Sequence, residues 1–448
     1  MNLYRIGWLW IALVCCPHLT YAGLLLEQAV DVSLGYQPSI ALQEQVVFAR
    51  RGQLKAAEGV FDTSVHSAVS QTQNRNLRLA TGLPHHVVQC EVGASRIFQS
   101  GLRVTPLLSS AMIREFGQAR TYNNSASIEF IYPLMRGREI AAVQTKANYH
   151  LEAEELRLLH QRMLVAQQVA LAYWDLLMRQ HMLQLWQQAK QRLKHRYSKS
   201  KDLLEAYQMT YDELFLQAKT QWLQSKQQLA LSMNLSLKNQ AMLDVLSSSF
   251  PEPKKREENM DELLSHVREK RADYQAIEKD QKGFGESILL ARDAMRWRMD
   301  LGVTVRYQGW RGRNTATISG PNTSVSLRMD LPWQNRVASS QMVIAQSSEQ
   351  QQAVQKNALL RQICTEINLK MSKLNLIVQR INRIQASVKS YELALSTQVD
   401  AWKWMDIHDR YVSAQVRDVQ ARSDYAKGLV QLRFAAGELL LDGRVNAN

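Results

Sequence analysis

Short segments in which apolar and polar residues alternate with a period of two recur along this chain. Successive side chains of a β-strand point to opposite faces, so each segment predicts a strand with one apolar and one polar face. In the clearest example, Met299–Tyr307, every second residue is apolar, and the intervening positions include Asp300 and Arg306. Phe61–Gln71 alternates less regularly and is the weakest of the predicted strands. The remaining two are Ser125–Tyr132 and Ser324–Leu331.

Two long stretches, 138–250 and 333–427, have neither glycine nor proline, although the chain contains 19 Gly and 9 Pro. At that average rate about 13 of these residues would fall in the two stretches. Glycine and proline both destabilise helix interiors, so their absence predicts continuous helix. We therefore expect long helical hairpins over 138–250 and 333–437, with arms of roughly 55 residues, or about 80 Å.

The same order of elements occurs twice. A helix, two predicted strands and a helical hairpin make up a first structural repeat, 23–250, and a second one, 260–440. Residues 251–259 begin with a Pro-Glu-Pro sequence and are the predicted linker, and residues 441–448 form a tail. The chain is thus predicted to be mainly helical with a small β part and an internal two-fold repeat.

Within these repeats, each opening segment is predicted to be helical. The two helices cover Leu26–Glu58, with a break at Pro38, and Met260–Ala291. A loop-rich region is expected between the first strand and Asn124, because glycine, proline and polar residues are scattered through it.

Residues 1–22 have the pattern of a secretory signal, with an early cation at Arg5 and an apolar core Ile6–Cys16. We expect cleavage after Ala22. A lipoprotein signal in which Cys16 is acylated is the alternative. Both interpretations predict an exported chain.

The formal net charge of +14 would suit a nucleic-acid partner, but the cations are dispersed along the predicted helices and fit solvated faces. An exported protein also meets no genome, so no nucleic acid is expected. The chain has no P-loop, HExxH motif or serine nucleophile elbow, so it is not predicted to be an enzyme. His85, His86 and Cys90 lack a fourth ligand nearby, and neither a metal nor a cofactor is expected.

Four strands cannot close a barrel, because the smallest transmembrane barrels have eight. Open sheet edges in lipid would leave unpaired backbone groups, at a cost of several kcal/mol each. If the strands lie in a membrane, the chain must therefore be an oligomer, and three copies would supply 12 strands. A half-buried sheet in a soluble domain is the alternative that the alternation leaves open.

Small residues recur at intervals of seven on the returning arms of both hairpins. In a coiled coil, such positions accept larger side chains from a neighbouring helix, so each arm is expected to pack against others. These residues are Ala218, Ser225 and Ser232 in the first half, and Ala414, Ala421 and Gly428 in the second.

Several short motifs follow one another in a defined order and spacing. They are Leu26–Val30 with Gln37–Pro38, Phe61–Thr63, Tyr132–Gly137, Leu171–Trp174, Lys270–Tyr274, and Ala421–Arg422 with Tyr425 and Ala435–Gly437. Together they resemble the TolC family of outer-membrane efflux and secretion ducts over essentially the whole mature chain.

The resemblance implies a homotrimer in which four strands per chain form a 12-strand outer-membrane β-barrel, continuous with a trimeric α-barrel in the periplasm. Such a duct is closed at its periplasmic tip by helix packing. It is opened by an inner-membrane transporter of the RND, ABC or MFS type together with a periplasmic adaptor (membrane fusion) protein.

Aligned on the small-residue heptads, the tips implied by the resemblance fall near Ala206–Glu213 and Ser396–Lys403. Neither segment has the glycine that is usual at such tips. Acidic residues there could form interhelical bonds that close the aperture, or could be solvated turn residues and helix caps. The aperture candidates are Gln208, Asp212, Glu213, Thr397, Asp400 and Lys403.

The polar faces of the second pair of strands would line the lumen of the barrel, where charges could tune passage or merely be hydrated. The candidates there are Asp300, Arg306, Arg328 and Asp330.

The sequence therefore predicts a passive channel in the cell outer membrane, with a long periplasmic extension and contacts to outer-membrane lipid. It would serve a tripartite efflux pump or a type I secretion system. A periplasmic coiled-coil adaptor or stalk protein of an export complex is the alternative. Such a protein would need the hairpins but not the alternating strands.

Overall fold

The computed structural model describes residues 24–73, 84–115, 120–136, 139–196, 201–235, 249–254, 267–312, 317–331, 333–397, 400–441 and 444–445. The predicted signal, with Cys16, lies outside these residues, as do residues 255–259 of the predicted linker and most of the predicted tail. The helices are α1 (Leu26–Tyr36), α2 (Pro38–Glu58), α3 (Glu139–Arg196), α4 (Lys201–Ser232), α6 (Ala272–Met295), α7 (Arg336–Thr397) and α8 (Ala401–Ala436). A 3-10 turn, η1 (Gly59–Phe61), follows α2.

The chain divides into two compact units, each built from both halves of the sequence. One comprises residues 1–45, 156–275 and 358–448, and the other comprises residues 46–155 and 276–357. The repeats predicted from the sequence are therefore interleaved and are not separate bodies.

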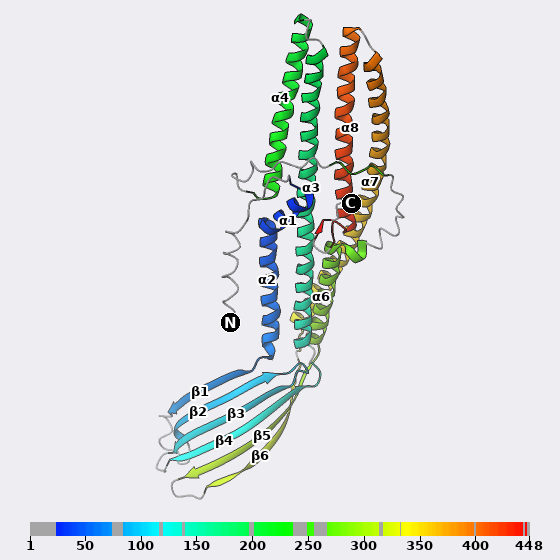
Figure 1. Cartoon of the computed structure of the whole chain (residues 1–448). Coiled ribbons are helices and arrows are strands. Elements are labelled where there is room, and N and C mark those ends of the chain that lie inside the picture. The colour runs from blue at the N-terminus through cyan, green and yellow to red at the C-terminus, as the bar shows by residue number, and fades with distance from the viewer. Residues whose placement is uncertain are drawn as a thin grey trace. The chain divides into compact units, whose positions relative to one another are not determined.

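A six-stranded antiparallel sheet forms the core of the second unit. Its order, β1-β2-β3-β4-β5-β6, follows the chain, so that every strand pairs with its neighbours in sequence (Figure 1). The strands are β1 (Ser64–Gln73), β2 (Pro84–Ile97), β3 (Arg103–Glu115), β4 (Thr121–Pro133), β5 (Arg298–Gly312) and β6 (Ile318–Asp330). The first half of the chain contributes four strands and the second half two.

The expectation of four strands per chain is wrong, because β2 and β3 occupy the region that was predicted to be loop-rich. Pro106 lies inside β3 and cannot donate to a ladder, a feature that argues against an interior strand. The structure accommodates it at an interruption of the β2–β3 ladder, which passes from the pair Gly93–Leu107 to the pair Arg96–Val104. A Cβ on the nearby Gly93 would lie 2.8 Å from the His66 ring and 2.9 Å from Leu107, so the close approach of these side chains requires glycine there.

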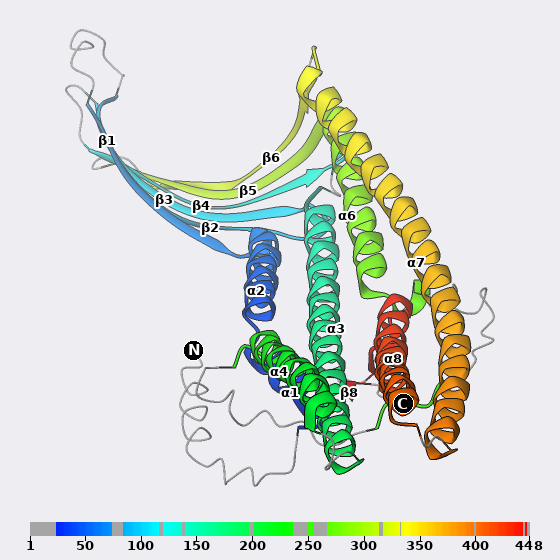
Figure 2. The same ribbon diagram turned by 90° about the horizontal axis from the view of Figure 1, so that it is seen from above.

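The helical unit is held by side chains from all four long helices. Around Tyr173 and Trp174 of α3, the buried core includes Leu229 of α4 and Val430 of α8. A second core joins α7 and α8, which lie side by side in both views (Figures 1 and 2). Within the described residues, no helix is both long and apolar enough to cross a bilayer.

The small residues of the returning arms pack as the heptad spacing indicates. Ala218, Ser225, Ala414 and Ala421 are all buried. A Cβ on Gly428 of α8 would lie 2.7 Å from the Leu374 side chain of α7. The contact of Leu374 with the bare backbone of α8 is the knob-in-hole arrangement that small heptad positions permit.

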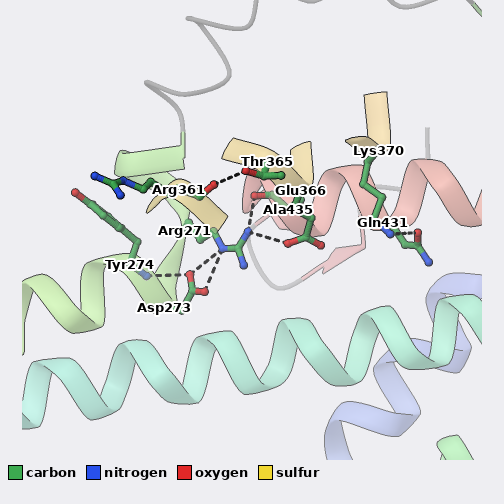
Figure 3. Close-up of polar contacts among 9 residues, drawn as sticks. All are labelled: Arg271, Asp273, Tyr274, Arg361, Thr365, Glu366, Lys370, Gln431 and Ala435. Atoms are coloured by element: carbon green, nitrogen blue, oxygen red, sulfur yellow. Dashed lines mark hydrogen bonds and ion pairs between the residues drawn. The ribbon is translucent and has the colours of Figure 1, made fainter. Parts of the chain in front are cut away.

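The end of α8 is fixed by Arg271, whose side chain is 8% exposed. Its guanidinium donates to the Asp273 carboxylate at 2.9 Å and to the carbonyl of Ala435 at 2.9 Å (Figure 3). Gly437 then terminates the helix with φ +79°, where a Cβ would also meet the Lys270 backbone at 2.9 Å. Glycine is therefore required at this C-terminal cap.

Candidate functional site: the two sheet faces and the helix-tip cluster

The sheet exposes its apolar face. Along β4 the even-numbered residues from Tyr122 to Tyr132 are exposed, whereas the odd-numbered residues between them are half-buried or buried. A soluble sheet with one core face shows the opposite pattern, in which the apolar positions are covered. The exposed set includes Ile128 at 44%, Phe130 at 38% and Tyr132 at 45%.

The strand register places most of the large apolar residues of the six strands on this same face. Val92 of β2 pairs with Leu108 of β3, Leu108 with Ala126 of β4, and Ala126 with Tyr307 of β5. The large apolar side chains that lie exposed on this face are Val65, Val69, Val92, Leu108, Tyr122, Ile128, Phe130, Tyr132, Val305, Tyr307, Val325, Leu327 and Met329.

The opposite face carries the polar positions, including the four lumen candidates. Asp300 of β5 pairs in register with Arg328 of β6, and Arg298 pairs with Asp330. The Asp300 carboxylate is 7% exposed and accepts a hydrogen bond from Arg298 Nε at 2.8 Å. Arg306 lies further along the same face, opposite Ser127 and Asn322.

Charged groups gather around one hollow on this polar face. A cavity of about 290 Å³ is lined by four charged residues, one from each of the successive strands β3 to β6: Arg103, Glu129, Asp300 and Arg328. Arg103 could not be placed there from the sequence, because its strand was not predicted. Whether the charges of this face act on passage stays a prediction.

Helix α7 ends at Thr397 and α8 begins at Ala401, and both residues belong to the segment Ser396–Lys403. Asp400 is the N-cap of α8, and its side chain accepts a hydrogen bond from Trp402 N at 3.1 Å. Thr397 bonds back to the carbonyl of Ala394 at 3.1 Å, and Lys403 is exposed. These contacts are those of helix termini, and an aperture role for the three residues stays a prediction.

The first turn lies earlier than expected. Helix α3 ends at Arg196 and α4 begins at Lys201, so the segment Ala206–Glu213 is helical and is not a turn. The placement near Ala206–Glu213 was wrong for two reasons. Heptad spacing shows which faces of the two helices pack together but not the residue at which the chain reverses, and no glycine marks the reversal in the sequence. Gln208 is half-buried and Glu213 is exposed on α4, while Asp212 forms an ion pair with Lys190 of α3.

A buried polar cluster near these helix ends connects the two hairpins. The Tyr211 hydroxyl of α4 donates to the Asp409 carboxylate of α8 and lies 3.0 Å from Nδ1 of His408. Because that hydroxyl proton is given to Asp409, we assign the Nδ1 proton to His408, which donates to the hydroxyl oxygen. The His408 ring is 1% exposed and stacks on Trp404 at a centroid distance of 4.7 Å.

The surroundings of the cluster disfavour charge on its histidine. Burial, with a smaller contribution from the Arg192 guanidinium of α3, lowers the pKa of His408 to about 4. Burial also raises the pKa of Tyr211, and the hydrogen bond to Asp409 acts in the same direction. The ring is therefore neutral at pH 7 and can serve as a fixed hydrogen-bond donor between the hairpins.

Across the part of the chain that the structure describes, no three His, Cys, Asp or Glu side chains converge as metal ligands would. Cys90 is exposed on β2, and His86 shares a hydrogen bond of 2.9 Å with Gln71. These residues lie on strands rather than in the surface loop that was expected.

The whole chain resembles several outer-membrane channels of known structure. The outer membrane protein VceC of Vibrio cholerae is 16% identical with a TM-score of 0.65, over 92% of this chain and 96% of that one. The CmeC outer membrane channel of Campylobacter jejuni is 13% identical with a TM-score of 0.63, over 94% and 87%. The open state of the MtrE outer membrane channel of Neisseria gonorrhoeae is 14% identical with a TM-score of 0.62, over 92% and 88%.

No protein-family model matches the sequence, and no curated protein matches it either. At identities of this size the structural likeness establishes the fold. It is the TolC-like fold that the order and duplication of the sequence motifs indicate.

Proposed function

We propose that this protein is the outer-membrane channel of a tripartite efflux pump or a type I secretion system. Three copies would form a passive duct from the periplasm to the exterior, without chemistry of its own. An inner-membrane transporter of the RND, ABC or MFS type would supply the energy, and a periplasmic adaptor protein would engage the helical end.

The observation that carries this proposal is the exposed apolar face of the sheet. Burying it against lipid would remove a large apolar area from water, at roughly 25 cal/mol per Å². Its opposite face holds charged and hydroxyl side chains, as a water-filled lumen requires. Because the apolar alternate positions of β4 are exposed, we assign lipid to the apolar side of the sheet and water to the polar side.

The open edges of the sheet support an oligomer. Strands β1 and β6 each have one neighbour in the sheet, and their residues are exposed almost throughout. Unpaired edges are not tolerated in hydrocarbon, so each edge must meet another copy. The four long helices support a periplasmic part in which helices from all copies share one wall.

A periplasmic adaptor or stalk protein is disfavoured by the same face. Such a protein would use long helical hairpins, but it would have no reason to keep thirteen large apolar side chains exposed on one side of a sheet.

The proposal is tested by placing the same charge on the two faces of β6. Leu327 is 57% exposed on the apolar face, and Ser324 lies on the polar face opposite Thr304. Arg on the lipid face costs about 2–4 kcal/mol per copy at the bilayer midplane and less towards the interfaces. Leu327→Arg should therefore abolish outer-membrane trimers, measured by membrane fractionation and native mass spectrometry, whereas Ser324→Arg should leave them intact. Equal assembly of the two variants would contradict the proposal.

A further inference from the structure

Resting on the proposed trimeric channel, we propose that the β2–β3 hairpin is part of the membrane wall. Each copy would then contribute six strands rather than four, and the barrel of the trimer would have 18 strands. The partner at each open edge is a second copy of this chain.

The hairpin is inserted into the sheet and not appended to it. Strand β1 pairs with β2 from Ser64 to Gln73, and β3 pairs with β4 from Arg103 to Ile113. Strands β1 and β4 are thereby held apart by two further strands, both of which are hydrogen-bonded on each side. A plug or an extracellular flap would not complete two ladders along this length.

The turn of the hairpin is tight. Gly101 N donates to the Phe98 carbonyl at 2.8 Å, and Phe98 N donates to the Leu102 carbonyl at 2.9 Å. Gly101 has φ +84°, a conformation that glycine adopts without strain. The chain therefore leaves the sheet at Ile97 and re-enters it at Arg103 with no room for a separate element.

The central residues of both inserted strands follow the polarity of the rest of the sheet, although Val87, Leu107 and Ile113 lie on the polar face. Leu108 is 62% exposed and Val92 is 48% exposed on the apolar face. On the polar face, Ser109 shares a hydrogen bond of 2.7 Å with Ser125, and Glu91 lies beside it in register. A one-residue slip would reverse the two faces, so the register itself fits this hairpin to a wall between lipid and water.

Closure by identical copies keeps the barrel antiparallel. In a six-strand meander the first and last strands run in opposite directions, so β6 of one copy can pair with β1 of the next. Three copies then give 18 strands, an even number of the kind that bacterial barrels use. Because barrel diameter grows roughly in proportion to strand number, the lumen would be about 1.5-fold wider than a 12-strand barrel of equal tilt.

Thiol labelling in outer membranes tests this inference, with Cys90 as the natural probe. Cys90 is exposed in the middle of β2, on the face that bears Val92 and Leu108. Cys364→Ser leaves Cys90 as the cysteine to be labelled, and the double variant Cys90→Ser/Cys364→Ser measures the background. A charged, membrane-impermeant methanethiosulfonate is the reagent.

Two reference positions are introduced into the double variant. Leu327→Cys reports the lipid face of β6, and Glu91→Cys reports the polar face of β2 next to the probe. We expect Cys90 and the cysteine at 327 to react at least tenfold more slowly than the cysteine at 91, and all three to react fast after denaturation.

Fast reaction of Cys90 together with protection at 327 would overturn the inference while leaving the channel in place. Fast reaction at both positions would instead contradict the proposed function, because no lipid face would exist. Slow reaction of all three before denaturation would place the polar face of the hairpin out of the lumen and would also overturn the inference.

Discussion

The two halves of the chain share one plan but differ in their strands. Each half runs from a helix through strands into a long helical hairpin, yet the first half contributes four strands to the six-stranded sheet and the second contributes two. Two extra strands restore the direction of the chain, and the register keeps the apolar face common to all six. The difference teaches that a β-hairpin is the smallest addition an antiparallel wall can accept without disturbing the elements around it.

The halves also differ in how their opening motifs are held. The first motif packs Leu26, Ala29 and Val30 into an apolar core. Its counterpart in the second half buries the guanidinium of Arg271, which contacts Asp273 and Ala435 (Figure 3). The same guanidinium lies 5.6 Å from the centroid of the Phe434 ring. The stability of the second half thus depends on a buried cation, the Arg271 guanidinium, that must stay hydrogen-bonded.

The largest expected effect comes from charging the inserted hairpin. Leu108→Arg should abolish outer-membrane assembly as completely as a charge on β6, because the residue would face lipid at a cost of about 2–4 kcal/mol per copy. Thr105→Arg is the matched control, since Thr105 pairs with Glu129 on the polar face. Native mass spectrometry of membrane extracts gives the readout. Assembly of the Leu108→Arg variant at the level of the control would mean that the extra strands lie outside the wall.

The next effect concerns the buried guanidinium. Arg271→Ala leaves the Ala435 carbonyl without the guanidinium donor and the Asp273 carboxylate without its cation, with only the Tyr274 N–H still bonded to that carboxylate, so a loss of about 3–5 kcal/mol of stability is expected. Arg380→Ala removes an ion pair with Asp424 whose two side chains are 51% and 45% exposed, and should cost less than about 1 kcal/mol. Thermal unfolding of both variants in detergent, followed by circular dichroism, measures the difference. Similar melting temperatures would show that Arg271 is not a structural anchor.

The smallest effect is a pH dependence at the helix-tip cluster. The folded-state pKa of His408, about 4, lies below the ordinary value of 6.5. Between these values the unfolded chain binds a proton that the folded chain does not, so stability falls as the pH is lowered from about 6.5 towards 4. The upper limit is about 1.4 kcal/mol per pH unit. The groups that face the ring are Arg192, Tyr211, Trp404 and Asp409.

Hydrogen exchange of α4 and α8 at pH 7.5 and pH 5 tests this expectation, with His408→Gln as the comparison. The native chain should lose protection at pH 5 by more than the variant does. The pKa of Asp409 is raised, chiefly by burial, and acts in the opposite sense at lower pH. The same loss of protection in both proteins would show that His408 is not the responsible group.

Regular patterns made much of this architecture predictable. Alternation in Ser125–Tyr132, Met299–Tyr307 and Ser324–Leu331 marks strands that the structure contains, and the glycine- and proline-free stretches form α3, α4, α7 and most of α8. Within the first stretch, however, α4 already ends at Ser232. Strands β2 and β3 escaped detection because Pro106, Gly93 and the adjacent pair Leu107–Leu108 break the period of two. Their alternation becomes visible only when their residues are paired with those of β4. The sequence of one strand does not give that pairing.

The polar cluster at the helix tips could not have been predicted from spacing. Tyr211 and His408 are 197 residues apart in sequence, and their contact depends on how two hairpins pack. The one local signal is the spacing of Trp404 and His408, which places their rings on the same side of one helix, a turn apart.

Electron cryomicroscopy of the full-length protein in lipid nanodiscs tests the central claim most directly, through a cross-section at the level of the bilayer. We predict three copies around a single pore with 18 strands in its wall. A pore with 12 strands, or particles in which the sheets form no ring within the bilayer, would contradict the account.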